Sequence, residues 1–495
     1  MSHTFTALDW AVLLAYLVGV TALGMWLGRR QKDARDYFLA DGSIPWAIIC
    51  VSVVATETSA LTFISVPATA YGSDFWMLQL ACGYVLGRAV VAALLLPGYF
   101  RGETLTAYAA LERRFGAGTR RFASAVFLVT RVLAGGVRVF AAAIPIRLIT
   151  GLPYWEAILL TGAFTVLYTW YGGLRAVVWA DVVQLAVYAL GGGAALWVLG
   201  TQVPGGWGTI VSAAPEKLRV FHPGGGFRSP SWVMTGLVGG AFLSMASHGV
   251  DHLIVQRLLA ARSLGDARRA LVASGVVVVL EFALFLSIGL GLFVLYHGRT
   301  FASPDEIFPT FIVERLPPGV TGLVIAAILA AAMSTISSTL NSLASSATHD
   351  LYAPLTGRTD EAHLMRVGKG MTLAWAVVLI GSAMLFQFVQ QGTPVVVIAL
   401  QIASFTYGGL LGGFLLGLVS KRAEARDAVA GMAVAIALMA ALWAAQQFKA
   451  VPKVIDSLWF SLLGSAVTVG VGCGLAALRG TRPVPGTMAE GEPVP

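Results

Sequence analysis

The chain contains few charged residues and almost no cysteine. Only 12% of its 495 residues are Asp, Glu, Lys or Arg, whereas soluble domains carry roughly 25%. So few charges cannot cover the surface of a water-soluble fold of this size. The three cysteines, Cys50, Cys82 and Cys473, lie in apolar stretches and form no CxxC pattern. Their placement excludes a disulfide-stabilised secreted scaffold and a cysteine-based metal site.

Apolar residues make up 57% of the chain and gather in long blocks. Blocks of about 18–25 residues can cross about 30 Å of hydrocarbon as helices. We therefore predict an all-α polytopic membrane protein with about thirteen transmembrane helices. The predicted spans lie near residues 8–28, 45–71, 76–98, 122–148, 154–171, 176–200, 231–250, 269–297, 319–347, 367–390, 394–419, 427–446 and 456–477.

The basic residues are distributed unevenly between the predicted loops. Alternate loops hold 22 of the 33 Lys and Arg residues, the opposite loops hold 8, and 3 lie inside spans: Arg88, Arg131 and Arg138. Because loops rich in Lys and Arg stay in the cytoplasm, we predict a multi-pass protein of the cytoplasmic membrane with its N-terminus outside and its C-terminus inside. This asymmetry accounts for the net charge of +8, so we infer no nucleic-acid partner. We also infer no obligatory protein partner.

No predicted loop is long enough to hold a separate soluble domain. We expect a single transmembrane domain over residues 1–478 and a disordered cytoplasmic tail over residues 479–495, which are rich in Pro and Gly. The chain has no HExxH motif, P-loop or nucleophile elbow. We therefore expect no enzyme, and a transporter that is passive or driven by an ion gradient. A membrane solute sensor without transport is a weaker alternative, because no output module is present.

The second predicted span contains an unusual run of polar residues. A carboxylate, four hydroxyls and a proline occur at Thr56, Glu57, Thr58, Ser59, Thr62 and Pro67. Polar groups are unfavourable in the bilayer and are therefore candidates for function. An unwound stretch here would free backbone carbonyls for a cation or a substrate. The alternative is a kinked helix whose hydroxyls bond to carbonyls one turn back.

The ninth predicted span carries a stripe of hydroxyls. Ser334, Ser337 and Ser338 have the spacing i, i+3, i+4 and share one helix face, with Thr335 close to it. Hydroxyl and carbonyl oxygens suit hard cations such as sodium. Close packing of small residues between helices would explain the same pattern equally well.

Three further ionisable residues lie inside predicted spans. Asp181 would lie about 9 Å deeper than Arg175 at 1.5 Å per residue, either as a functional acid or as an interfacial acid paired with an arginine. Arg131 and Arg138 are seven residues apart and share a face. Either one could bind a carboxylate or phosphate substrate, or form a structural pair between helices, for example with Glu57.

Two weaker signals complete the ionisable residues. Glu281 in the eighth predicted span is interpreted as a buried structural acid. His248, Asp251 and His252 cluster at the inner end of the seventh span, too loosely to indicate a metal site.

These stretches, in this order, resemble the sodium/solute symporter family over about residues 5–450. The matching pieces are Ala55–Pro67 with Ala70-Tyr71-Gly72, Tyr171–Gln184, Asp251–Arg257, Ala331–Ser342 with Asp350-Leu351-Tyr352, and Gly408–Phe414. The resemblance implies a LeuT-type fold of two inverted five-helix repeats, about residues 45–200 and 231–420. One helix would precede the repeats and two would follow them.

The resemblance also implies sodium-coupled symport of a small organic solute into the cell by alternating access. Sodium would be the coupling ion, with no other cofactor. The positions that match the family's main sodium site are Ala55, Thr58, Ala331, Ser334 and Thr335. Those that match a second sodium site of some members are Asp181, Ser334, Ser337 and Ser338. Ser59 and Thr62 match substrate-contacting positions of the sialic acid branch, and Glu57 matches an acidic position important for sodium in the proline branch.

The solute itself is predicted only as a class. An intramembrane arginine beside Ser59 and Thr62 favours a small organic anion or zwitterion. The substrate-binding candidates are Glu57, Ser59, Thr62, Arg131 and Arg138. Proton coupling through Glu57 is the alternative to sodium coupling. The sugar-binding residues of the glucose and galactose carriers have no match, and the family's frequent Asp-Gln pair is Asp251-His252 here.

Overall fold

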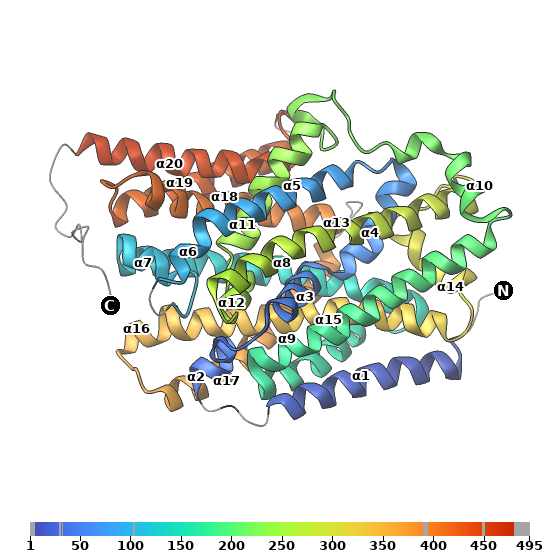
Figure 1. The fold of residues 1–495 in the computed structure, drawn as a ribbon, viewed down its shortest axis with the longest axis horizontal. Helices are drawn as coiled ribbons and strands as arrows, with labels where there is room; N and C mark the ends of the chain where they lie inside the picture. Colours follow the sequence, from blue (N-terminus) through green and yellow to red (C-terminus); the bar gives the residue numbers. More distant parts are fainter. Residues whose placement is uncertain are drawn as a thin grey trace.

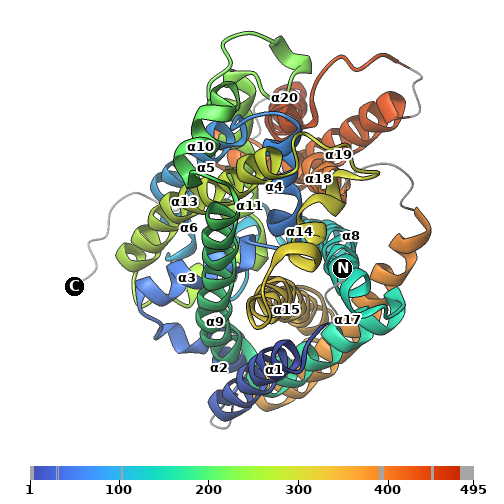
Figure 2. The same cartoon turned by 90° about the vertical axis from the view of Figure 1, so that its right-hand side faces the viewer.

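A computed structural model describes residues 5–28, 31, 33–101, 104–389, 395–447 and 451–479. In these ranges the chain forms helices and no β-strand. Most long helices run roughly parallel to one another (Figure 1). Viewed along that direction, α4 (Ala60–Gly72) and α11 (Gly240–Gly249) lie inside the bundle, with α1 (Ala7–Leu27), α17 (Glu361–Val389) and α20 (Phe460–Leu478) towards its edges (Figure 2).

The helices follow the predicted spans closely. Their bounds are α1 (Ala7–Leu27), α3 (Trp46–Glu57), α4 (Ala60–Gly72), α5 (Met77–Val90), α8 (Ala117–Thr150), α9 (Tyr154–Gln202), α11 (Gly240–Gly249), α13 (Leu264–Leu295), α15 (Val320–Ser346), α17 (Glu361–Val389), α18 (Val395–Val419), α19 (Ala425–Gln447) and α20 (Phe460–Leu478). Within the described ranges, nine helices are long and apolar enough to cross a membrane, or ten if the bent pair α3 and α4 is one span. The number of thirteen and the orientation of the termini therefore stay predictions.

The second predicted span is broken at its polar run. α3 ends at Glu57, Thr58 has an extended backbone, and Ser59 begins α4 with a capping box to Thr62. The axes of α3 and α4 differ by 66°. Hydroxyl side chains that bond to nearby backbone compete with helix continuation, which explains why the chain unwinds here.

A second broken helix lies at the start of the other predicted repeat. α11 ends at Gly249, and Asp251 caps the short helix α12 (His252–Leu259). The Asp251 carboxylate accepts a hydrogen bond of 3.0 Å from the backbone N–H of Leu253. Each of the two predicted repeats therefore has an interrupted helix near its start.

The 49-residue element α9 consists of two helices. At 1.5 Å per residue its length would be about 74 Å, more than twice the hydrocarbon thickness. Gly173 interrupts it with φ 55° and ψ −159°, a conformation open to glycine. A Cβ atom at this position would lie 2.5 Å from the Tyr37 carbonyl oxygen. The predicted spans 154–171 and 176–200 are the two halves.

Glycines bring α5 into direct backbone contact with the start of the seventh span. A Cβ atom on Gly83 would lie 2.4 Å from the carbonyl oxygen of Gly236. One on Gly87 would lie 2.3 Å from that of Ala241. Such contacts are typical of membrane helices, where small residues let backbones approach closely.

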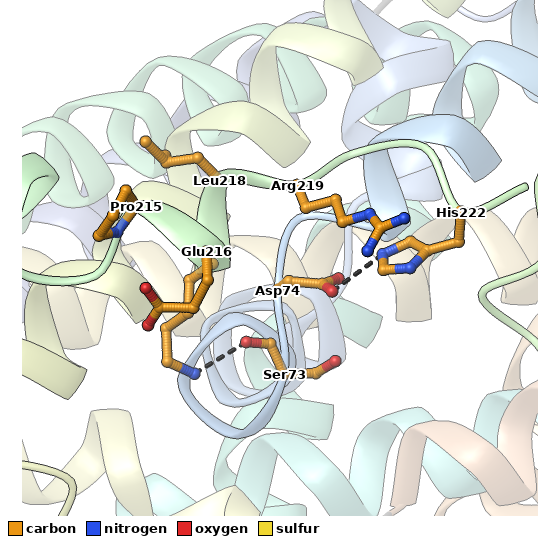
Figure 3. A pocket seen from close by; sticks show the side chains of 8 residues that line it. Ser73, Asp74, Pro215, Glu216, Leu218, Arg219 and His222 are labelled. Atoms are coloured by element: carbon orange, nitrogen blue, oxygen red, sulfur yellow. Dashed lines mark hydrogen bonds and ion pairs between the residues drawn. The ribbon is translucent and has the colours of Figure 1, made fainter.

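The connection between α9 and α11 is attached to the end of α4 (Figure 3). The Lys217 ammonium donates hydrogen bonds to the carbonyl oxygens of Ala70 (3.2 Å), Tyr71 (2.8 Å) and Ser73 (2.8 Å). It also lies 4.1 Å from the centre of the Phe293 ring. The last carbonyls of a helix have no hydrogen-bond donor within the helix. At the end of α4, Lys217 is that donor.

Candidate functional site

A cavity of about 150 Å³ lies beside the break between α3 and α4. Its walls come from α3, α4, α5, α8, α11, α12, α13 and α18. The cavity brings together all five predicted substrate-binding residues, namely Glu57, Ser59, Thr62, Arg131 and Arg138. The other polar residues that line it are Thr56, Ser65, Thr69, Tyr84, Ser247, His248 and Tyr407.

Arg131 is held by protein partners. It is 3% exposed, and its Nε donates to the Asp251 carboxylate at 3.1 Å. A terminal nitrogen of the same guanidinium bonds to Asp251 and to the Tyr407 hydroxyl. These contacts join α8 to the α11–α12 break and to α18. The carboxylate of Asp251 therefore already occupies the position where an anionic ligand would bind Arg131.

Arg138 differs from Arg131 in having no such partner. Its Nε atom is buried and has no hydrogen-bond acceptor among the residues that the structure describes. No salt bridge within the described part of the chain includes it, and it lines the cavity. Buried polar groups are almost always paired. Its free guanidinium can accept an anion from the cavity, so the two arginines that the sequence treated alike have different environments.

Glu57 pairs with an arginine that the sequence analysis did not choose. Its carboxylate forms an ion pair with fully buried Arg88 of α5, and His248 Nε2 lies 3.4 Å away. Arg88 also donates to the Ser274 hydroxyl at 2.7 Å. The suggested pairing of Glu57 with Arg131 or Arg138 was wrong. Arg88 was recognisable as an intramembrane arginine, but no sequence spacing links it to Glu57.

Two of the five positions that match the main sodium site, Ser334 and Ala55, are in contact between α15 and the end of α3. The Ser334 hydroxyl of α15 lies within hydrogen-bonding distance of two acceptors, the Ala55 carbonyl at 2.9 Å and the Asp181 carboxylate at 2.6 Å. Thr335 donates to the Ala331 carbonyl at 3.1 Å. The Thr58 backbone lies in the break itself. These oxygens form the mainly neutral set that suits a monovalent hard cation.

Two of the positions that match the second sodium site, Asp181 and Ser338, contact a buried arginine, Arg257. Asp181 is fully buried and accepts hydrogen bonds from Ser52 and Ser334. Arg257 Nη2 lies 3.4 Å from the Asp181 carboxylate and also bonds to Ser338. Ser337 donates to the Ser334 carbonyl at 3.1 Å.

Two expectations about this group change. Asp181 does not pair with Arg175, which lies 3.1 Å from Asp36. Arg257, which is one of the 22 basic residues counted in the predicted cytoplasmic loops, is fully buried. The only sequence feature that pointed to a role for Arg257 was its place in the run Asp251–Arg257, which matches the family.

Comparisons with known proteins identify the family and the fold of this chain. A sequence model of the Sodium:solute symporter family matches residues 37–435. The sodium/sialic acid symporter SiaT of Proteus mirabilis is 30% identical over 452 residues, which cover 88% of this chain and 89% of that protein. The solved structure of a Na⁺-coupled sialic acid symporter in a substrate-bound outward-open state has a TM-score of 0.85 and 29% identity, and the match covers 96% of this chain and 98% of that one.

A more distant structure shows the same fold. Mhp1, a nucleobase-cation-symport-1 family transporter, matches with a TM-score of 0.60 and 14% identity over 91% of this chain and 96% of that one. This supports the LeuT-type arrangement of the helices. With a family match over most of its length, the chain belongs to the sodium:solute symporter family.

Proposed function

We propose that this protein couples sodium entry to the uptake of a small monovalent organic anion by alternating access. The assignment of an anionic solute rests on the guanidinium of Arg138, which lines the cavity and has no ion-pair partner among the described residues. The other two residues of opposite charge that line the cavity, Glu57 and Arg131, each form an ion pair, Glu57 with Arg88 and Arg131 with Asp251. One positive charge is left over, which a carboxylate on the solute would neutralise. The sialic acid symporters among its relatives are consistent with such a solute.

We place the coupling ion at Ala55, Thr58, Ala331, Ser334 and Thr335. An ion there would contact both the broken helix and α15, because the Ala55 carbonyl already lies within hydrogen-bonding distance of Ser334. Binding would fix the break, and Ser59 and Thr62, which begin α4, line the solute cavity. This shared segment couples the two ligands. Each sodium moving inward through 100 mV contributes about 2.3 kcal/mol.

Proton coupling through Glu57 is less well supported by the geometry. Arg88 lies against the carboxylate and neutralises it within the protein. A proton carrier would have to break this pair in every cycle. Uptake driven by a pH gradient in sodium-free buffer would favour that alternative.

The anion assignment is tested with Arg138→Gln and Arg138→Lys in reconstituted vesicles. We expect Arg138→Gln to raise the half-saturating concentration of a carboxylate solute about tenfold or more, because hydrogen bonds to charged groups each contribute about 1.5–3 kcal/mol. Arg138→Lys keeps the positive charge and should raise the half-saturating concentration by a smaller factor. The solutes tested are sialic acid and short monocarboxylates. Uptake of each acid is compared with uptake of its neutral amide, with and without sodium.

Two results would contradict the assignment. One is an unchanged half-saturating concentration in Arg138→Gln. The other is equal uptake of the neutral amides.

A further inference from the structure

Glu281 is a buried carboxylate without a cationic partner. It lies on α13 and is 8% exposed. Its two oxygens accept hydrogen bonds from the Thr58 hydroxyl (2.7 Å) and the Tyr188 hydroxyl (2.8 Å). No salt bridge in the described ranges includes it. A buried carboxylate is unfavourable unless a positive charge or strong donors compensate it.

The nearby arginine does not supply that charge. Arg88 forms its ion pair with Glu57, and its other terminal nitrogen bonds to Ser274. The two partners that Glu281 does have are neutral hydroxyls. One of them, Thr58, is the non-helical residue between α3 and α4. Glu281 is therefore one hydrogen-bonded residue away from the place assigned to sodium.

The proposed ligands of that ion lack charge of their own. Ala55 and Ala331 can offer only carbonyl oxygens, and Ser334 and Thr335 add hydroxyls. A cation that leaves water for such a set gains from a negative charge nearby, and the attraction is stronger in the protein than in water. Asp181 also approaches Ser334, but Arg257 pairs with it.

We infer that Glu281 is the buried counter-charge of the main sodium site and positions Thr58 for that ion. This inference rests on the sodium site proposed above and gives it a residue on a further helix. By donating to Glu281, the Thr58 hydroxyl fixes the side chain and with it the backbone of the break. Sodium binding would in turn bring a positive charge near a buried carboxylate that forms no salt bridge within the described ranges.

The test compares three variants by a sodium titration in the absence of solute. Glu281→Gln keeps the size and an acceptor oxygen but removes the charge. Glu281→Asp keeps the charge on a shorter side chain. Glu314→Gln is the matched control, because Glu314 also accepts from a tyrosine hydroxyl, that of Tyr296 at 3.3 Å, away from the cavity. The measurement is the sodium concentration that gives half of the maximal rise in melting temperature, with choline keeping the ionic strength constant.

We expect Glu281→Gln to raise that sodium concentration about tenfold or more. At an effective dielectric constant of about 20, the attraction between a buried carboxylate and a nearby cation is large enough to account for this change. Glu281→Asp should give a smaller increase, and Glu314→Gln none. An unchanged value in Glu281→Gln, or an equal change in the control, overturns the inference. If Glu281→Gln does not fold, an unchanged value in Glu281→Asp overturns it instead. A wild-type protein without any sodium-dependent shift would refute the proposed sodium site itself, so the two failures are distinguishable.

Discussion

Single residues in this transporter differ mainly in which partner they find across the bundle. Arg131 and Arg138 share a helix face, yet only Arg131 meets a carboxylate, that of Asp251. That partner lies 120 positions further along the chain. The free guanidinium is the one available for a solute.

At this scale we predict that Ser334→Ala weakens sodium activation of uptake. The change removes one proposed ligand and the contact with the Ala55 carbonyl. A loss of about 1 kcal/mol corresponds to a roughly fivefold higher half-activating sodium concentration. Ser342→Ala on the same helix is the control, because the Ser342 hydroxyl bonds only to the Thr339 carbonyl of its own helix. Unchanged sodium dependence in Ser334→Ala would contradict the site.

The sequence could predict which residue types gather at the site but not how they pair. Polar residues inside apolar blocks stand out by composition, so Glu57, Asp181 and the serine stripe were recognisable. The pairing of Glu57 with Arg88 and the burial of Arg257 depend on the approach of distant helices. Such contacts leave no periodic trace in one sequence.

Helices and their connections are where local sequence and tertiary contacts meet. The apolar blocks predicted most helix bounds to within a few residues, because helix length in a bilayer is set by hydrocarbon thickness. The break at Thr58 was one of two stated possibilities. The interruption at Asp251 was not predicted, because its sequence has no comparable hydroxyl run.

At the element scale we predict that Lys217→Met lowers the melting temperature of the purified protein by a few degrees. The substitution removes the donors for three carbonyls at the end of α4 and the contact with Phe293. Hydrogen bonds from a charged donor contribute about 1.5–3 kcal/mol each. Arg219→Gln is the matched control on the same connection, since Arg219 is exposed and makes a single long bond of 3.5 Å to Phe221. Equal melting of both variants and wild type would show that the attachment does not stabilise α4.

The whole molecule determines how much electrical work a transport cycle performs. Two sodium ions carried with one monovalent anion would move one net positive charge per solute. We predict this ratio because every position of the second site carries oxygen, namely Asp181, Ser334, Ser337 and Ser338. The experiment measures charge and solute movement together in proteoliposomes.

The ratio also depends on the second site in a testable way. Ser337→Ala combined with Ser338→Ala should lower it towards zero, because one ion would then accompany one anion. A ratio near zero in the wild-type protein would reject the second sodium ion. The Arg257 guanidinium already beside Asp181 would have to move away for that ion to bind.

The backbone contact between α5 and the seventh span restricts where the molecule can bend. At Gly83 and Gly87 no side chain of α5 separates its backbone from that of the seventh span. Because interiors this closely packed resist sliding, we expect the two helices to move together as a rigid body. We then expect the bending to occur at residues 58–59 and 250–251, where the chain is already non-helical. An alanine at Gly87 would push α5 away from the seventh span. We expect it to disturb the opening and closing of the transporter even though the bending itself occurs at other residues.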